Sequence, residues 1–316
     1  MTDPAPSDRR VLVLTHTGRD AACDVARASV VGLTGQGITV RVPAVEAGDL
    51  GLDPALVASS MVEVVEHLDD AGAGCELALV IGGDGTILRA AEIALPTGTP
   101  ILGVNLGHVG FLAEAEHDHV AATLEAIVSR SYVAEDRMTL DVRVYHEGAL
   151  VRSTFALNEA SVEKASRERM LEVVAEVDGR PLSRWGCDGV VCATPTGSTA
   201  YNFSAGGPVV WPDVDALLMV PISAHALFAR PLVVSPDSVL AVEVLPGPQS
   251  AGVLWADGRR AVELPPGARI EVRRGPHPVR LVRLHEAPFT DRLVAKFGLP
   301  VEGWRGRAER LQRGEL

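Results

Sequence analysis

The sequence predicts an α/β N-terminal domain with an open Rossmann-like sheet, followed by a mostly-β, sandwich-like C-terminal domain. Length and composition are the first two observations behind this fold class: the chain has 316 residues, about twice a typical single domain, and 47% of them are hydrophobic. Patterning is the third. Short apolar runs alternate with helical stretches in the first half, whereas the second half alternates apolar and polar residues between turns.

The N-terminal domain is expected at residues 9–135. Its predicted strands are the apolar runs 11–14, 38–42, 77–81 and 101–104. A first helix is predicted after the loop at 15–19 and ends at about residue 33, and further helices are predicted at 54–68, 86–94 and 119–129. The run 77–81 is apolar throughout, as in a parallel strand that is buried on both faces. Alternating strands and helices of this kind form a doubly wound sheet, which binds ligands at the carboxyl ends of its strands.

The β-rich domain is expected at residues 136–286. Its predicted strands include 140–145, 172–177, 238–245, 253–256 and 269–273, with turn residues between them. The segment that follows, 287–302, contains a helical pattern over 289–297. We expect this segment to pack back onto the first domain.

The charge of the chain argues against several classes of function. Forty-one acidic against 29 basic residues give a net charge of −12, which disfavours binding of nucleic acid or of a membrane through bulk positive charge. Lys164 and Lys296 are the lysines of the chain and neither follows a glycine, so the Gly-Lys-Ser/Thr phosphate loop is absent. The cysteines lack the paired spacing of a zinc site and the N-terminus shows no signal pattern, so we expect a cytoplasmic protein.

The motif Gly82-Gly83-Asp84-Gly85-Thr86 follows a predicted buried strand and opens a predicted helix. Its glycines permit close approach of a ligand to the backbone, and free N–H groups at the start of a helix attract phosphate oxygens. Asp84 has two interpretations: it caps the helix, or it accepts a proton from a hydroxyl group that attacks phosphorus. The glycine-bearing segment 105–112 follows the next strand, so we expect it at the same rim of the sheet.

Asn158 and Glu159 place an amide and a carboxylate side by side after an apolar stretch. Adjacent residues of a strand point to opposite faces, so both side chains reach one ligand only if the strand ends or bulges there. The alternative interpretation is a solvated polar pair.

The charge-free run 189–212 is long enough to cross a membrane, but it is filled with glycines and hydroxyl residues and is not predicted to span one. Thr196, Ser198 and Thr199 suit the cap of a short helix that starts near residue 198. The run also suits a pocket that hydrogen-bonds a sugar and an amide while it stacks a ring, with the Asp188 carboxylate nearby.

Together these motifs resemble the NAD kinase family, in its actinobacterial type, from residue 11 to residue 305. The segments that carry the resemblance are 16–19, 82–89, 105–114, 158–159, 188 with 194–208, and 288–293. The motif at 82–86 alone is shared with diacylglycerol, sphingosine and phosphofructokinase-like kinases. The run Thr-Pro-Thr-Gly-Ser-Thr-Ala-Tyr at 194–201 is much more selective.

The resemblance implies transfer of the γ-phosphoryl group of ATP, or of polyphosphate, to the 2′-hydroxyl of the adenosine ribose of NAD. It also implies a divalent cation, Mg²⁺ or Mn²⁺, and a homo-oligomer, either a dimer or a tetramer. Asp84 then matches the catalytic proton acceptor, Tyr201 matches the stacking residue, and Gly82, Gly83 and Thr86 belong to the phosphate loop. The residues that match NAD-binding positions are Gly85, Arg89, Asn158, Glu159, Arg169, Asp188, Thr199, Ala200, Tyr201, Asn202, Phe203, Ser204 and Asp257.

Two other functions are weighed against this one. A lipid kinase of the diacylglycerol type needs a membrane-facing patch, and the net charge of −12 without an amphipathic basic helix counts against it. A non-catalytic, NAD-sensing binding protein would keep the pocket without the chemistry. Retention of Asp84 disfavours that function.

Overall fold

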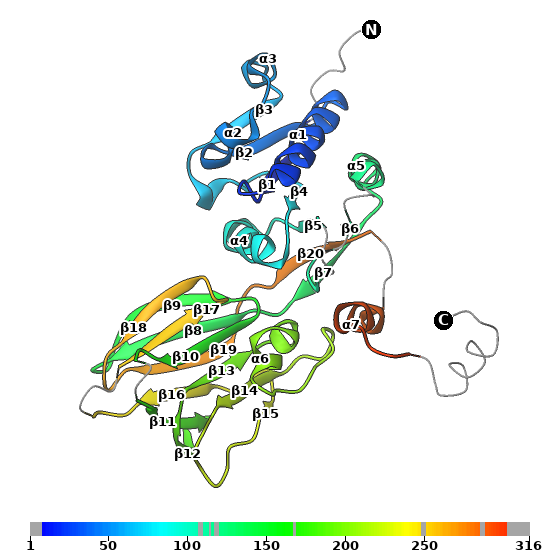
Figure 1. The fold of residues 1–316 in the computed structure, drawn as a ribbon. Coiled ribbons are helices and arrows are strands. Elements are labelled where there is room, and N and C mark those ends of the chain that lie inside the picture. The colour runs from blue at the N-terminus through cyan, green and yellow to red at the C-terminus, as the bar shows by residue number, and fades with distance from the viewer. Residues whose placement is uncertain are drawn as a thin grey trace, which may run out of the picture. The chain divides into compact units, whose positions relative to one another are not determined.

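The computed structural model describes residues 8–106, 110–113, 115–116, 120–166, 169–247, 251–284 and 288–301. The chain forms two compact units. The first comprises the described residues of Met1–Ala90, Ile101–Ala134 and Val282–Leu316, and the second comprises those of Ala91–Pro100 and Glu135–Leu281. Figure 1 shows the course of the chain and the labels of its elements.

The first unit is built on a mostly parallel sheet with the strand order β3-β2-β1-β4-β5-β20-β7, in which β6 also pairs with β5. The strands are β1 (Arg10–Thr15), β2 (Thr39–Pro43), β3 (Val62–Val65), β4 (Leu77–Ile81), β5 (Ile101–Asn105), β6 (Ala115–Glu116), β7 (Val133–Arg137, which continues into the second unit) and β20 (Val279–Arg283, which begins in the second unit). Residues 11–14 and all of β4 are buried, because both faces of the sheet are covered. The open Rossmann-like sheet predicted from the sequence is confirmed.

Two of the helices in this unit, α1 and α4, are long, and each buries one apolar face in the core. The helices are α1 (Asp20–Gly35), α2 (Ala44–Leu50), α3 (Pro54–Ala58), α4 (Asp84–Ala94, which continues into the second unit), α5 (Val120–Ser129) and α7 (Phe289–Phe297). Short 3₁₀ turns, η1 (Leu68–Asp70) and η2 (Leu95–Thr97), follow β3 and α4. No helix within the described ranges has both the length and the apolar character that a membrane span requires.

The predicted helix at 54–68 is wrong in most of its length. After one turn of α3 the Ser59 hydroxyl donates to the carbonyl of Leu56 and accepts from the N–H of Met61, which ends the helix. The next residues, Val62–Val65, then pair in parallel with β2 as strand β3. Three of these four residues are β-branched valines, which favour a strand over a helix, and the partner strand decided the outcome.

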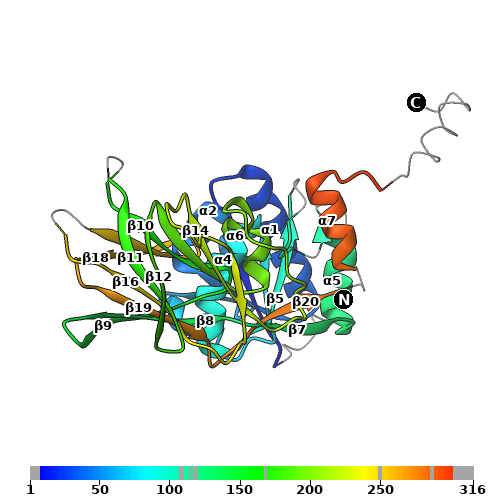
Figure 2. The same ribbon diagram turned by 90° about the horizontal axis from the view of Figure 1, so that it is seen from below.

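The second unit consists of two antiparallel sheets of six strands each, with the orders β15-β14-β13-β10-β17-β18 and β12-β11-β16-β19-β8-β9. The first sheet has β10 (Glu159–Lys164), β13 (Gly189–Ala193), β14 (Leu217–Ile222), β15 (Leu232–Val234), β17 (Gly252–Ala256) and β18 (Arg260–Leu264). The second has β8 (Leu140–His146), β9 (Ala149–Ala156), β11 (Leu171–Val177), β12 (Arg180–Cys187), β16 (Leu240–Val244) and β19 (Arg269–Arg274). All of these strands are labelled in Figure 1, and most of them can also be followed from another side in Figure 2.

One apolar core lies between these two sheets. Its largest fully buried side chain is Trp185, whose indole nitrogen donates to the carbonyl of Phe228 at 2.8 Å. Val162 of the first sheet and Val242 of the second belong to the same cluster, so both sheets bury one face against each other. The sandwich-like character predicted for the second half is confirmed.

The C-terminal helix α7 packs within the first unit, against the loop at residues 110–113. The rings of Phe289 and Phe297 each lie 5.9 Å from the ring of Phe111, measured between centroids. The guanidinium of Arg292 donates to the carbonyls of Phe111 and Ala113. These contacts fix the loop that follows β5.

Candidate functional site

The loop after β4 lies where the sheet of the first unit changes direction. The chain runs from β1 outward to β3 and then returns to β4 on the other side of β1, which is the kind of switch point where open α/β sheets bind ligands. Here Gly82 has φ +153°, and a Cβ on it would lie 2.4 Å from the Thr86 hydroxyl. The first residue of the neighbouring loop, His16, donates its N–H to the carbonyl of Ile81 at 3.0 Å. The motifs at 16–19 and 82–86 therefore lie side by side.

The Asp84 carboxylate is half-buried at the first position of α4. Its two oxygens accept one hydrogen bond each, from the N–H groups of Phe111 and Leu112, both at 3.2 Å. A Cβ on Gly110 would lie 2.4 Å from the same carboxylate, so only glycine allows this approach. The structure thus joins Asp84 to the segment 105–112 at one rim, as expected, although residues 107–109 of that segment lie outside the described residues.

Arg89 and Glu46 form an ion pair at the carboxyl end of β1. The Nη2 of Arg89 donates to the Glu46 carboxylate and, at 3.2 Å, to the carbonyl of Thr15, whose N–H in turn donates to Glu46 at 2.7 Å. Glu46 is only 2% exposed, and burial raises the pKa of its carboxyl group while the Arg89 charge opposes that rise. Among the described residues Arg89 has no partner for Nε or Nη1, so these donors can still bind a phosphate.

In the second unit the chain bends at Asn158 and leaves the strand direction. Strand β9 ends at Ala156 and β10 begins at Glu159, so the break required for two adjacent side chains to serve one ligand is present. Asn158 and Glu159 are both buried, and the interpretation as a solvated pair is therefore wrong. The hydroxyl and the N–H of Thr194 donate to the carbonyls of Leu157 and Asn158, which fixes the carbonyl side of the bend.

Glu159 is a buried carboxyl group that accepts a hydrogen bond from the N–H of Tyr201 at 3.3 Å. Burial, and secondarily the charge of Asp257, raises the pKa of Glu159 to about 8. At neutral pH the side chain is therefore mostly protonated, with one O–H donor as well as acceptor positions. Such a group can bind a sugar hydroxyl either as a hydrogen-bond donor or as an acceptor.

The run at 194–208 forms the 3₁₀ turn η4 (Thr196–Thr199) and the short helix α6 (Tyr201–Ser204). The prediction that its hydroxyls cap a helix is wrong. The Ser198 hydroxyl instead exchanges hydrogen bonds with the backbone of Val210, and Gly197 packs so tightly that a Cβ on it would lie 2.0 Å from the carbonyl oxygen of Asn158. The N–H of Gly197, near the start of η4, donates instead to the hydroxyl of Thr194 at 3.0 Å.

The other residues that match NAD-binding positions differ in exposure. Asn202 is fully buried and its amide donates to two carbonyls of its own loop, whereas Phe203 is exposed and the Tyr201 ring is half-buried. Asp188 pairs with Lys164, which holds the pKa of Asp188 below its usual range. Arg169 is exposed. Among the described residues, no group of three or more His, Cys, Asp or Glu side chains is arranged as a metal cage.

Family models match both halves of the chain. The ATP-NAD kinase N-terminal domain matches residues 12–132, and the ATP-NAD kinase C-terminal domain matches residues 157–284. The chain belongs to the ATP-NAD kinase family. The family predicted from the motifs is thus confirmed, and the enzyme is a phosphotransferase that acts on NAD.

Relatives of this kinase support the same assignment. The NAD kinase of Thermobifida fusca is 62% identical over 312 residues, which cover 98% of this chain and 95% of that protein. NAD kinase 2 of Streptomyces coelicolor is 63% identical, with 94% and 97% covered. A solved NAD kinase from Archaeoglobus fulgidus in complex with ATP is similar with a TM-score of 0.67 at 25% identity, covering 92% of this chain and all of that chain. Yeast NADH kinase complexed with NADH has a TM-score of 0.83 at 24% identity, covering 93% and 89%, and supports the fold.

The sequence did not single out Glu46, which pairs with Arg89, or Thr194, which holds the bend at Asn158. Glu46 stands alone in a short helix, and its only sequence signal is a charged residue just after a buried strand. Thr194 lies within the selective run, but its hydroxyl bonds to a segment 37 residues earlier in the chain. Such contacts depend on strand pairing and leave no local pattern.

Proposed function

We propose that the chain transfers the γ-phosphoryl group of ATP, or of polyphosphate, to the 2′-hydroxyl of the adenosine ribose of NAD, with Asp84 as the proton acceptor. The hydroxyl oxygen forms a bond to the γ-phosphorus, the bond from that phosphorus to the leaving phosphate oxygen breaks, and the hydroxyl proton passes to Asp84. The observation that carries this role is the position of the half-buried Asp84 carboxylate at the switch-point loop, with one N–H bond on each oxygen. Each oxygen keeps a lone pair for the proton.

On the phosphate side, we assign Gly82, Gly83, Gly85 and Thr86 to the loop that receives the donor. The N–H groups at the start of α4 are available to the negative charge that phosphates bring, and Nε and Nη1 of Arg89 have no partner within the described part of the chain. A divalent cation, Mg²⁺ or Mn²⁺, fits this donor set only if the nucleotide phosphates supply most of its ligands, since no protein cage is present among the described residues. Such a cation would offset the charge of the transferred phosphoryl group.

On the NAD side, we assign Asn158 and Glu159 to the ribose and base groups and the rings of Tyr201 and Phe203 to stacking. The further contacts follow the family match: Gly85, Arg89, Arg169, Asp188, Thr199, Ala200, Asn202 and Ser204. The bend at residue 158 supports this role, because it frees two neighbouring side chains from the strand alternation. We also propose that the kinase works in the cytoplasm as a dimer or tetramer, which light scattering on the purified protein would test.

The test of the catalytic role is Asp84→Asn, assayed with NAD, a magnesium salt and either ATP or polyphosphate. We expect the unmodified kinase to form NADP and the variant to lose about 10²–10⁴-fold in kcat, because the proton acceptor is gone. The affinity for NAD, measured by calorimetry, is expected to stay within about threefold, because the hydrogen bonds of this aspartate go to the backbone of its own unit and the amide oxygen can keep one of them.

The matched control is Asp53→Asn, which changes an aspartate that caps α3 and accepts from the N–H of Ala55. We expect turnover of this control to be unchanged. Absence of NADP with every donor would contradict the function, full activity of Asp84→Asn would contradict the catalytic role, and NAD binding without any turnover would favour the sensor.

A further inference from the structure

Asp257 matches an NAD-binding position of the family, yet the structure buries its side chain completely. It lies with Gly258 in the tight turn between β17 and β18, where both residues have positive φ, +53° and +63°. Its side chain has 0% exposure. A carboxylate in this position has no surface with which to contact a nucleotide.

Both oxygens of the Asp257 carboxylate accept hydrogen bonds from groups of its own unit. One oxygen accepts from the N–H of Asn158 at 2.7 Å and of Glu159 at 3.4 Å, and the other accepts from the N–H of Leu157 at 3.0 Å. This second oxygen also accepts a hydrogen bond from Nη2 of Arg260 at 2.7 Å. Two oxygens thus hold four donors, which is their ordinary capacity.

We propose that Asp257 is a positioning residue that acts on the nucleotide substrate through Asn158 and Glu159 and does not touch the substrate itself. The proposal rests on the NAD site assigned above. Asp257 holds the N–H side of the bend, and Thr194 holds its carbonyl side. Between them, the bend keeps the two consecutive side chains in place for one ligand.

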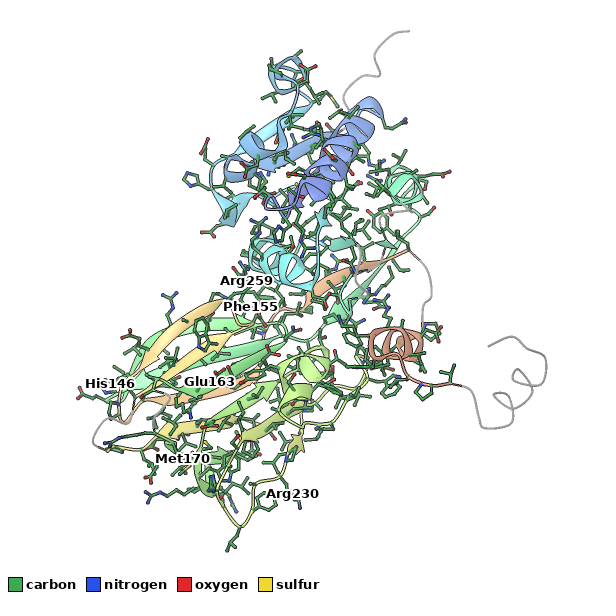
Figure 3. All side chains as sticks on the ribbon, in the orientation of Figure 1. His146, Phe155, Glu163, Met170, Arg230 and Arg259 are labelled. Atoms are coloured by element: carbon green, nitrogen blue, oxygen red, sulfur yellow. The ribbon has the colours of Figure 1, made fainter. Side chains whose placement is uncertain are left out.

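Arg260 supports the aspartate from the far side. Its guanidinium lies over the ring of Phe155, with the central carbon 4.3 Å from the ring centroid, and its Nε lies 3.4 Å from the carboxylate of Glu92. Glu92 also pairs with Arg259 at 2.9 Å, and Figure 3 labels Phe155 and Arg259 at this end of the second unit. The turn that carries Asp257 is therefore anchored by ion pairs as well as by its strands.

Because Asp257 carries a charge, replacing it should also change the pKa of Glu159. The loss of a purely structural contact would not change that pKa. Its negative charge adds to the effect of burial in raising the pKa of Glu159, and Glu163 acts in the same direction. The N–H of Tyr201 opposes that rise, and Arg260 partly neutralises Asp257. Removal of the Asp257 charge is thus expected to lower the pKa of Glu159.

The experiment is Asp257→Asn in the full chain, with kinetics and calorimetric NAD binding measured from pH 6 to 9. An amide has a single acceptor oxygen, so it cannot satisfy the N–H groups of Leu157 and Asn158 together with Arg260. We expect KM and Kd for NAD to rise about tenfold and KM for ATP to change less than about twofold. The midpoint of the pH dependence of NAD affinity, expected near pH 8 in the unmodified kinase, is expected to move to lower pH.

Asp178→Asn is a closely matched control. Asp178 also precedes a glycine in a hairpin turn with positive φ, and its carboxylate accepts from the N–H of Val239 at 2.8 Å, but it serves the other sheet. We expect this variant to lose stability without any change in NAD affinity. An equal rise in KM for NAD in both variants would overturn the proposal, as would a normal KM, or an unmoved pH midpoint, in Asp257→Asn.

A second variant covers the case in which Asp257→Asn does not fold. Arg260→Gln removes the ion pair and leaves the three backbone hydrogen bonds, so a smaller rise of about threefold in KM for NAD is expected. An unchanged KM would overturn the proposal. Absence of NADP from the unmodified kinase would instead overturn the proposed function, and the calorimetric NAD affinities would still test Asp257.

Discussion

At the residue scale, two of the carboxyl groups with assigned roles, Asp84 in the first unit and Glu159 in the second, have different surroundings. Asp84 is half-buried and accepts two N–H groups at the rim of a parallel sheet. Glu159 is 7% exposed, accepts one N–H and lies near another carboxylate. Burial with few hydrogen bonds favours the neutral form of a carboxyl group. Glu159 therefore suits hydrogen bonding to hydroxyl groups, whereas Asp84 suits proton acceptance.

The burial of Glu159 predicts a pH dependence of stability. Its pKa rises from 4.5 to about 8 on folding, so between these pH values the folded chain holds more protons than the unfolded chain, and this group lowers stability as pH rises. We expect Glu159→Gln to remove this loss, so that the free energy of unfolding of the variant relative to the unmodified kinase increases from pH 5 to pH 8. The gain is on the order of a few kcal/mol.

Urea unfolding at pH 5, 6, 7 and 8 measures this difference. The control is Glu172→Gln, which removes a half-exposed carboxylate of the same unit that pairs with Arg184 at the surface. Its free energy of unfolding should stay parallel to that of the unmodified kinase, since exposed pairs contribute little. Parallel curves for Glu159→Gln as well would show that Glu159 is ionised in the folded chain at neutral pH.

The sequence predicts single residues well where local chemistry demands them. The glycines around Asp84 and the run at 194–201 are recognisable because close backbone approach permits few residue types. The sequence gives no sign that Asp257 is buried, since its partners lie about 100 residues earlier in the chain. The Glu46–Arg89 pair is hidden for the same reason, because strand order brings its members together.

At the element scale, the loop after β5 and the start of α4 behave as one unit around Asp84. A Cβ on Gly110 would lie 2.4 Å from Oδ1 and 3.0 Å from Cγ of Asp84. Gly110→Ala therefore has to displace the carboxylate or the loop that donates to it. We expect kcat to fall about 10–100-fold with a smaller effect on KM for either substrate, since a small misplacement of a catalytic group is costly.

Steady-state kinetics and thermal unfolding of Gly110→Ala test this expectation. Gly35→Ala is the control, because its Cβ would meet nothing within 4 Å at the end of α1. That variant should be as active as the unmodified kinase and slightly more stable, as alanine favours a helix. Equal kcat values for the two variants would show that Asp84 tolerates displacement.

Elements with a long and regular hydrophobic pattern could be predicted from the sequence, whereas short elements could not. The apolar run of β4 and the helical pattern of α7 are found at the expected residues, because each pattern is long and matches one period. The prediction of a helix at 54–68 failed because the apolar residues of a five-residue helix and of a four-residue strand together match the pattern of one amphipathic helix. A short strand is decided by its partner, which here is β2.

At the scale of the whole molecule, a net charge of −12 has to be reconciled with substrates that are themselves anionic. Bulk electrostatics repel such ligands, so binding must depend on local donors such as the N–H groups at the start of α4 and the unused nitrogens of Arg89. The same bulk charge repels an anionic lipid surface, which a lipid kinase of the diacylglycerol type would need to approach.

This reasoning predicts that the kinase does not bind vesicles of phosphatidylserine and phosphatidylcholine and does not phosphorylate diacylglycerol within them. Sedimentation with vesicles at low salt, where electrostatic attraction would be strongest, measures the first point, and radiolabelled ATP with lipid extraction measures the second. NAD in the same tubes supplies the internal control, since NADP should form whether or not vesicles are present. A labelled lipid product, or protein that sediments with the vesicles at low salt and is released at high salt, would show that a local basic surface outweighs the net charge of −12.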